Sequence, residues 1–419
     1  MAKYIIEGGN KLSGKVKISG NKNSVLPCLA ATLLTEEEVI LKNIPNISDV
    51  EVFCDILKGL GASVERKSDQ LTIQCKDIKV ALLPEDKMTK IRASILLVGP
   101  LLARLGQVEF SHPGGDVIGK RSIDTHLEAF RELGYVFEIS DRQYKGVKFE
   151  ERTQNKEIFL AEASVTATEN MILTTVLGNS AVILKNCATE PHVADLCNLL
   201  IKMGARIEGV GQSTLRIIGV EKLTGASFVI GSDFIEFGTY AIAAAITGGE
   251  VEIENIEFTN LLPVIKHLER FGLTFENLGK SIKVGFTELT APGNKLHTNI
   301  WPGFPSDLMS VAVVLATQCK GISLLHDWMF ESRMFFTDKL ISMGANITIA
   351  DPHRVLVSGV TPLYGRVQET PDIRAGMALV LASLVAVGKS TINKAELIER
   401  GYEDVVGKLS SLGAQIVEE

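Results

Sequence analysis

Hydrophobic and polar residues follow a pattern along the chain that recurs six times, each time around one short phrase. In this phrase an amphipathic stretch runs into a glycine, and apolar residues alternate with polar ones after it. The six copies occupy residues 57–64, 130–137, 200–207, 268–275, 340–347 and 409–416. Their glycines lie 73, 70, 68, 72 and 69 residues apart, so the chain is built from six structural repeats of about 70 residues.

Each phrase predicts a junction between a helix and a strand. A glycine accepts the left-handed conformation that ends a helix, and the alternation after it has the period of a half-buried strand. Each repeat also contains a second stretch that is apolar on every side and therefore predicts a buried helix. Clear examples are residues 91–105, 238–247, 308–317 and 375–387. One core is improbable for 419 residues, so we expect an α/β protein with two domains of three repeats each.

Composition excludes several classes of function. The net charge of −7 gives no cationic surface for nucleic acid. The apolar run 377–388 is too short to span a bilayer and the first residues lack a signal peptide, so we expect a cytoplasmic chain without a membrane partner. The six cysteines form no C-x-x-C pair, which predicts neither a metal site nor a disulfide framework. We expect reduced cysteines in the core and no cofactor.

Charged residues at the starts of helices give the first indication of a ligand. Lys22, Arg92 and Arg374 stand where the helix dipole already disfavours a cation, and this is tolerable if an anion binds there. For each residue alone, a surface salt bridge is the alternative explanation. Carboxylates at such positions also have a structural explanation, because they cap helices. The loop 112–126 combines glycines with charges, which favours a mobile lid over an ordinary turn.

Over its whole length the chain resembles the enolpyruvyl transferases, and within them the enzymes that act on UDP-N-acetylglucosamine. The resemblance rests on the order and spacing of many short phrases. They are Ser19-Gly-Asn-Lys22-Asn23, Arg92-Ala-Ser, Pro113-Gly-Gly-Asp116-x-Ile-Gly119-x-Arg121-x-x-Asp124-x-His126, Ser164-Val165, Ala188-x-Glu190-Pro191, Asp233-x-Ile-Glu236-x-Gly-Thr239, Phe304-Pro-Ser-Asp307, Phe330-Glu-x-Arg333, Asp372-x-Arg374 and Arg400-Gly-Tyr402.

The resemblance implies the enolpyruvyl transferase fold, with two inside-out α/β barrel domains of three repeats around buried helices. One domain would span residues 22–230 and carry the lid, the other 1–21 plus 231–419, with the active site in the cleft between them. The implied reaction moves the enolpyruvyl group of phosphoenolpyruvate to the 3'-hydroxyl of UDP-N-acetylglucosamine and releases phosphate. This is the first committed step of peptidoglycan synthesis. We expect a monomer.

The resemblance also assigns roles to residues. The catalytic set would be Lys22, Asp116, Asp307 and Arg400, with Asp307 as the base for the hydroxyl proton. Phosphoenolpyruvate would bind to Lys22, Asn23, Arg121 and Arg400. The UDP-sugar would contact Asn23, Arg92, Arg121, Ser122, Ile123, Asp124, Thr125, Ser164, Val165, Thr166, Ala167, Asp307 and Met329. Glu190, Arg333 and Arg374 would support the site.

The chain departs from the family pattern at four positions. Asp116 stands where most relatives have the cysteine that fosfomycin alkylates, which implies resistance to fosfomycin. Ser48, Thr166 and Phe234 replace an expected basic residue, glycine and arginine. Two alternatives stay open at this point. One is a shikimate-phosphate enolpyruvyl transferase, which the Gly-Gly-Asp lid disfavours, and the other is a paralogue that binds a UDP-sugar without turning it over.

Overall fold

The chain folds into two compact units, each with its own hydrophobic core. The structure, a computed structural model, describes residues 2–116, 118–149 and 155–419. Unit 1 consists of Met1–Ser19, Val117–Lys120 and Ser232–Glu419, and unit 2 of Gly20–Asp116 and Arg121–Gly231. Separate clusters of buried apolar side chains fill the two units. The domain boundaries that the resemblance implies stay a prediction; the two units are described one at a time below.

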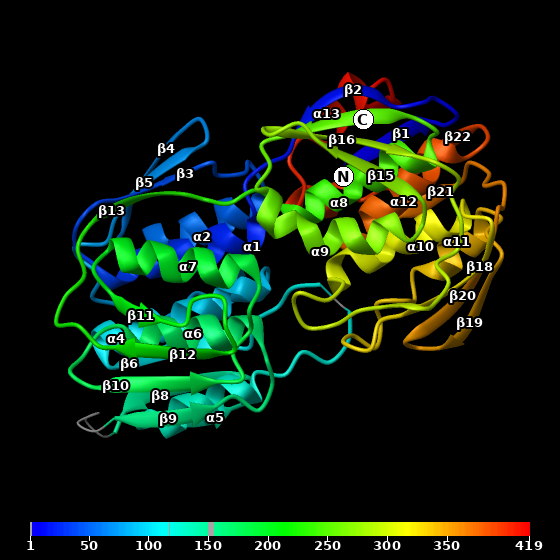
Figure 1. Ribbon diagram of the computed structural model, residues 1–419. Coiled ribbons are helices and arrows are strands. Elements are labelled where there is room, and N and C mark those ends of the chain that lie inside the picture. The colour runs from blue at the N-terminus through cyan, green and yellow to red at the C-terminus, as the bar shows by residue number, and fades with distance from the viewer. Residues whose placement is uncertain (1, 117, 150–154) are drawn as a thin grey trace. The chain divides into compact units, whose positions relative to one another are not determined.

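Unit 2 contains three sheets, with strand orders β13-β3-β5-β4, β6-β8-β7 and β11-β12-β10-β9 (Figure 1). Its strands are β3 (Val39–Lys42), β4 (Ser63–Lys67), β5 (Gln70–Gln74), β6 (Gln107–Ser111), β7 (Tyr135–Ser140), β8 (Gln143–Lys148), β9 (Lys156–Phe159), β10 (Ala181–Lys185), β11 (Arg206–Glu208), β12 (Thr214–Ile218) and β13 (Ala226–Val229). Its helices are α1 (Lys22–Ala31), α2 (Ser48–Gly59), α3 (Glu85–Met88), α4 (Val98–Leu105), α5 (Asp124–Glu132), α6 (Val165–Thr175) and α7 (Pro191–Lys202), with 3-10 turns η1 (Thr32–Leu34) and η2 (Arg92–Leu97).

Unit 1 also contains three sheets, with strand orders β15-β16-β14-β2, β17-β18-β20-β19 and β21-β22-β1-β23. Its strands are β1 (Lys3–Glu7), β2 (Ser13–Lys17), β14 (Glu250–Glu254), β15 (Leu273–Asn277), β16 (Ser281–Phe286), β17 (Leu296–His297), β18 (Gly321–His326), β19 (Ile347–Asp351), β20 (Arg354–Gly359), β21 (Val367–Glu369), β22 (Lys389–Asn393) and β23 (Gln415–Glu418). Its helices are α8 (Phe234–Ile246), α9 (Phe258–Glu269), α10 (Met309–Thr317), α11 (Thr337–Ser342), α12 (Ile373–Val385) and α13 (Val405–Ser411), with 3-10 turns η3 (Ser306–Leu308) and η4 (Ala395–Arg400).

One order of elements recurs in the repeats: a strand, a buried helix, a second strand, a more exposed helix and an antiparallel pair of strands. The sheet β6-β8-β7 departs from it, because in the part of the chain that the structure describes it has three strands where the others have four. In the sheet of β9 to β12, for example, β9 pairs in parallel with β10, and β12 lies antiparallel between β10 and β11. The predicted buried helices are confirmed, since every residue of α8 and of α10 is buried. The stretch 91–105 begins as the 3-10 turn η2 and becomes α-helical at Val98.

The six phrase glycines confirm the predicted junctions. Their φ angles all lie between 93° and 107°, in the left-handed region that side chains disfavour: Gly61, Gly134, Gly204, Gly272, Gly344 and Gly413. Each follows a helix and precedes a strand, as between α7 and β11. The six cysteines are free and buried. No helix among the described residues is long and apolar enough to cross a membrane.

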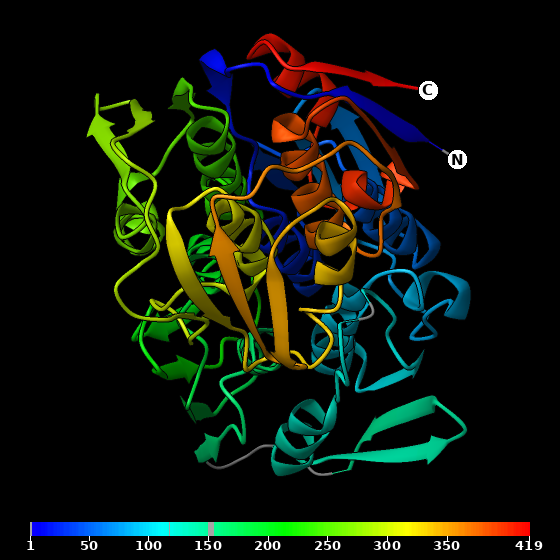
Figure 2. The ribbon, with the colours of Figure 1, turned by 90° about the vertical axis from the view of Figure 1, so that its right-hand side faces the viewer.

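The two ends of the chain meet in one sheet of unit 1. The strand β1 lies between β22 and β23 and pairs antiparallel with both. The first strand of the chain therefore serves as the last strand of the sixth repeat. Figure 2 shows the blue start and the red end of the chain side by side. Unit 2 closes in a related way, because β13 pairs in parallel with β3.

Candidate active site

Lys22 and Asn23 begin α1, and their local conformation follows from the asparagine before them. The side chain of Asn21 caps the helix by accepting a hydrogen bond from the Asn23 amide at 2.8 Å. The Lys22 ammonium lies 2.7 Å from a carboxylate oxygen of Asp49, and both side chains are at most one-tenth exposed. A buried cation of this kind requires such a partner. Sequence reasoning missed Asp49, because an acid in the first turn of a helix is explained by the helix dipole.

Arg92 and Arg121 bring two guanidinium groups together in unit 2. Arg92 donates hydrogen bonds to the carbonyl oxygens of Ser122 at 2.8 Å and Pro113 at 3.5 Å. Burial, and next the charge of Arg121, lower the pKa of Arg92 to about 10. A Cβ added to Gly115 would meet Arg92 Cβ at 2.8 Å and Arg121 Nη1 at 3.4 Å, so glycine leaves room for the pair. Two adjacent guanidinium groups are typical of a site for a multiply charged anion.

The residues after Arg121 lead into α5. Ser122 accepts a hydrogen bond from the Asp124 amide through its hydroxyl at 3.0 Å, while Ile123 and Thr125 are buried. A second candidate segment begins α6, where the Ser164 hydroxyl caps the helix by accepting from the Ala167 amide at 3.4 Å. Val165 and Thr166 form the first turn of that helix.

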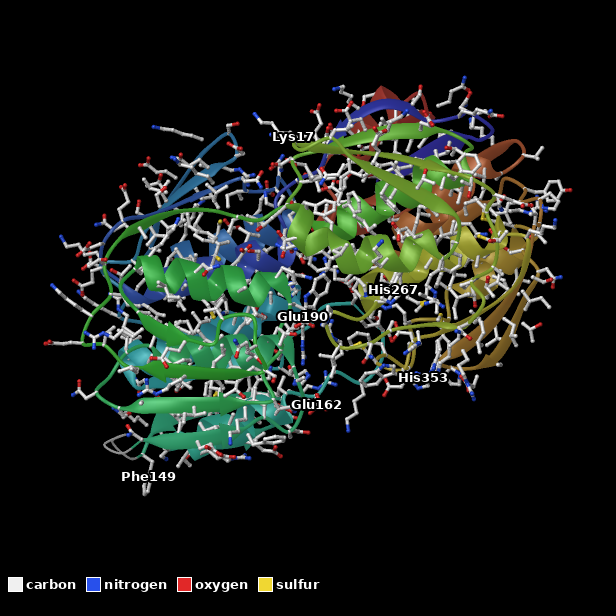
Figure 3. The ribbon with its side chains drawn as sticks, in the orientation of Figure 1. Lys17, Phe149, Glu162, Glu190, His267 and His353 are labelled. Carbon is white, nitrogen blue, oxygen red and sulfur yellow. The ribbon has the colours of Figure 1, made fainter. Side chains whose placement is uncertain are left out.

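Glu190 lies at the start of α7, as Figure 3 shows, and its side chain is half-buried. The loop before it is tied to α6, because the Ala188 amide donates to the Thr168 hydroxyl at 3.0 Å. Burial, and next the charge of Glu190, raise the pKa of Glu169 well above its ordinary value; burial also raises the pKa of Glu190. One buried oxygen of each carboxyl has no hydrogen-bond partner among the described residues. Glu169 was not predicted, since the sequence places it within an ordinary buried helix.

Asp307 lies in unit 1 between two arginines. One carboxylate oxygen accepts from Arg333 Nη2 at 3.0 Å and the other from Arg374 Nη2 at 2.9 Å. The arginine side chains are 2% and 5% exposed, whereas Asp307 is 31% exposed. The carboxylate of Asp307 is therefore accessible, while the two guanidinium groups that hold it are buried.

The two arginines have further hydrogen-bonding capacity. Arg333 lies over the ring of Phe330 and Arg374 over that of Tyr402, at 5.3 and 5.2 Å from the ring centres. Arg333 Nη1 and Arg374 Nη1 are buried and have no hydrogen-bond partner among the described residues, whereas Arg333 Nε lies 4.0 Å from an oxygen of buried Asp327. Buried unpaired donors are uncommon, so they favour an additional anionic group at this place.

The remaining predicted residues lie near this cluster along the chain or in the loop 113–121. The Met329 amide donates to buried Asp327 at 3.0 Å, and Asp327 also accepts from Ser306, the neighbour of Asp307, at 2.5 Å. Asp327 thus links two predicted segments and was missed, since no pattern singles it out. Arg400 is half-buried at the end of η4, and Asp116 is half-buried in the loop.

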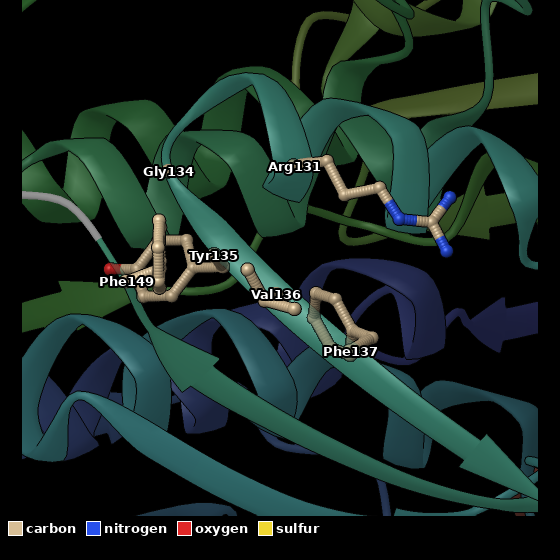
Figure 4. A pocket seen from close by; sticks show the side chains of 6 residues that line it. All are labelled: Arg131, Gly134, Tyr135, Val136, Phe137 and Phe149. Atoms are coloured by element: carbon tan, nitrogen blue, oxygen red, sulfur yellow. The ribbon is translucent and has the colours of Figure 1, made fainter.

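A surface hollow elsewhere in unit 2 contains none of the predicted residues. Arg131, Gly134, Tyr135, Val136, Phe137 and Phe149 line it, as Figure 4 shows. Among the described residues, no group of three or more His, Cys, Asp or Glu side chains is arranged to hold a metal ion.

Comparison with known proteins decides the family. The family model for EPSP synthase (3-phosphoshikimate 1-carboxyvinyltransferase) matches residues 6–409. The chain belongs to this family of enolpyruvyl transferases. Two relatives are named UDP-N-acetylglucosamine 1-carboxyvinyltransferase: one from Borreliella burgdorferi is 48% identical and one from Treponema denticola 45% identical, and each match covers 99% of both chains.

Solved structures confirm the enolpyruvyl transferase fold. The enolpyruvyl transferase NikO from Streptomyces tendae matches with a TM-score of 0.89 at 23% identity, covering 100% of this chain and 98% of its own. EPSP synthase from Acinetobacter baumannii matches with a TM-score of 0.75 at 18% identity, covering 100% of both. The enolpyruvyl transferase fold that the resemblance implied is therefore confirmed.

Proposed function

We propose that the protein is a UDP-N-acetylglucosamine 1-carboxyvinyltransferase that transfers the enolpyruvyl group of phosphoenolpyruvate to the sugar's 3'-hydroxyl. The observation that carries this proposal is the near-complete, 48% identical match to a relative of that name. In the reaction, a bond forms between the 3'-oxygen and C2 of phosphoenolpyruvate, and the bond from C2 to the phosphate oxygen breaks. The products are the enolpyruvyl ether and phosphate. This step begins the synthesis of peptidoglycan precursors.

The cationic residues of unit 2 suit the negative charges of the substrates. Arg92 and Arg121 form a paired guanidinium site, and Lys22 is a buried ammonium held by Asp49. We assign Lys22, Asn23, Arg121 and Arg400 to phosphoenolpyruvate. The UDP moiety is assigned to Arg92, the stretch 121–125 and the start of α6 at 164–167. Cations with several donors are the natural partners of phosphate and carboxylate groups.

Asp307 is the best-supported base for the 3'-hydroxyl in this proposal. It is a carboxylate, it is partly exposed, and two buried arginines fix its orientation. A base must reach the hydroxyl proton within hydrogen-bond distance, so fixed orientation contributes to the rate. Asp307 removes the hydroxyl proton, and we assign to Asp116 the proton that is added to the methylene carbon of phosphoenolpyruvate. When phosphate leaves and the double bond re-forms, that carbon returns its proton to Asp116, and the proton held by Asp307 passes to the departing phosphate.

Two other functions are less well supported. A shikimate-phosphate enolpyruvyl transferase shares the fold, but relatives that are 40%, 45% and 48% identical carry the UDP-sugar name. A paralogue without catalysis does not account for the buried arginines that orient Asp307. We keep as proposals that the enzyme acts as a monomer in the cytoplasm and needs no cofactor.

Phosphate release tests the proposal directly. The purified full-length protein is mixed with phosphoenolpyruvate and UDP-N-acetylglucosamine, with phosphoenolpyruvate and shikimate 3-phosphate, or with phosphoenolpyruvate alone. We expect phosphate only in the first mixture, together with an enolpyruvyl ether detectable by mass spectrometry. Release that depends on shikimate 3-phosphate, or binding of the UDP-sugar without release, would overturn it.

A further inference from the structure

A buried hydrogen-bond network joins four elements of unit 2 next to the predicted nucleotide site. His126 on α5 contacts Asn170 on α6 through Nδ1 at 3.0 Å and Thr166 Oγ1 through Nε2 at 3.1 Å. Asn170 continues the network to η2 and α4, because it contacts the Ile95 carbonyl at 3.0 Å and the Gly99 amide at 2.8 Å. His126 is 2% exposed and Asn170 is fully buried.

The network determines where its protons lie. The Gly99 amide can only donate, so Asn170 Oδ1 accepts and its Nδ2 is the donor to both Ile95 and His126. Nδ1 of His126 must then be an acceptor, and the ring proton resides on Nε2. Burial, and next the charge of Arg92, lower the pKa of His126 to about 3, so the ring is neutral at physiological pH. His126 therefore donates from Nε2 to the Thr166 hydroxyl oxygen.

This donation orients the Thr166 hydroxyl. Because its oxygen receives the imidazole proton, its own proton must point away from His126. Thr166 is half-buried in the first turn of α6, where the helix dipole is positive and the Ser164 cap has taken up the Ala167 amide. The positive charge of Arg92 also acts on the nearby His126. The electrostatic surroundings of the Thr166 hydroxyl therefore favour a negatively charged hydrogen-bond acceptor. Glycine, which the resemblance leads us to expect at this position, would offer no such donor.

We propose that His126 and Asn170 are positioning residues that hold the Thr166 hydroxyl as a hydrogen-bond donor to a phosphate oxygen of the UDP moiety. The inference rests on the proposed function, since it takes the nucleotide as the ligand of this segment. The contact is made by a side chain whose direction is fixed by the neutral imidazole of His126.

Calorimetric titration of the full-length protein with UDP tests the contact. Replacing Thr166→Val removes the hydroxyl and keeps the shape, so UDP should bind about 10-fold more weakly or worse. Thr166→Ser is the matched control, and it should retain most of the affinity. His126→Leu should weaken UDP binding in the native background, yet cause no further loss when combined with Thr166→Val. Equal UDP affinity for the native protein and Thr166→Val, or full additivity of the two losses, would overturn the proposal.

A second measurement keeps the proposal testable if His126→Leu does not fold. In nitrogen NMR spectra of histidine-labelled protein, the signals lost in His126→Gln identify the ring of His126. We expect the pattern of a neutral imidazole protonated on Nε2, unchanged between pH 8 and pH 5, whereas a protonated ring or the opposite tautomer contradicts the inference. Phosphate release is measured in parallel. UDP binding with the predicted coupling but no turnover would refute the proposed function and leave this inference standing.

Discussion

At the scale of single residues, the clearest feature is the pairing of Asp307 with two arginines. Each carboxylate oxygen accepts one guanidinium hydrogen bond, so the group has little freedom to rotate. A base must meet the hydroxyl proton in one geometry, so this fixed orientation suits the role proposed for Asp307. The buried nitrogens Arg333 Nη1 and Arg374 Nη1 have no hydrogen-bond partner among the described residues and could bind an additional anion.

Replacing Asp307→Asn should therefore separate binding from chemistry. The amide has the same shape but cannot take up the hydroxyl proton, so turnover should fall by about 100-fold or more. Affinity for UDP, measured by calorimetry, should change little, because UDP lacks the hydroxyl that Asp307 serves. The unfolding temperature controls for damage to the arginine cluster. Near-normal turnover in a folded variant would remove Asp307 from the mechanism.

The lowered pKa of His126 predicts how the stability of the fold changes in acid. Its pKa is about 3 in the folded protein, whereas an unfolded histidine titrates near 6.5. Between these values the unfolded chain binds the proton and the folded chain does not. The contribution of neutral His126 to the free energy of unfolding is complete above about pH 6.5. It falls by up to about 1.4 kcal/mol per pH unit as the pH decreases. In denaturant titrations from pH 7 to pH 4, His126→Gln should lose less stability than the native protein, and parallel curves would contradict the assignment.

Asp116 makes a pharmacological prediction. Fosfomycin is an epoxide that a thiolate opens to form a stable thioether, and a carboxylate is a poorer nucleophile. The native enzyme should therefore keep its activity after incubation with fosfomycin, while Asp116→Cys should lose it with time. Mass spectrometry of the inactivated variant should show one covalent adduct on Cys at position 116. Inactivation of the native protein at the same rate would show that another group reacts.

At the scale of elements, the contact between α6 and the start of α7 carries a stability cost. Glu169 is buried, the nearby Glu190 is half-buried, and burial raises the pKa of both. A carboxyl with a raised folded pKa stabilises the fold at low pH, and this contribution is lost as the pH rises above about 4.5. Glu169→Gln should thus be more stable than the native protein at pH 7, with a difference that grows as the pH rises above about 4.5. A difference that stays constant with pH would mean that Glu169 does not titrate there.

Local patterns predicted the elements well because their causes are local. Glycine at position 204 ends α7 whatever lies around it, and the all-apolar stretch of α8 must be buried. The partners within the site were less predictable. Asp49 and Asp327 become important only because folding brings them to Lys22 and to Ser306. The phrases quoted for the resemblance found Lys22, Asp307 and Arg374, but not the contacts that orient them.

At the scale of the whole molecule, the position of β1 predicts that unit 1 alone depends on the first residues of the chain for its stability. Tyr4 and Ile6 on β1 are buried in the core of unit 1, and β1 separates β22 from β23. Deleting residues 2–8 removes both side chains and two sets of strand pairing, at a cost of several kcal/mol. In limited proteolysis followed by mass spectrometry, cleavage should increase in peptides from 232–419, while those from 20–116 and 121–231 stay protected. Equal cleavage in both units would contradict this.

The position of β1 also fixes an order of events during synthesis. All of unit 2, including its closing strand β13, has been made once the ribosome has passed residue 231, so its sheets have all their strands early. The strand β1 leaves the ribosome first, but its partner β22 follows only at Lys389 and β23 only at Gln415. Both edges of β1 therefore stay unpaired until almost the whole chain has emerged. A ribosome that stalls late therefore leaves a nascent protein whose oldest strand is still the one most exposed to aggregation.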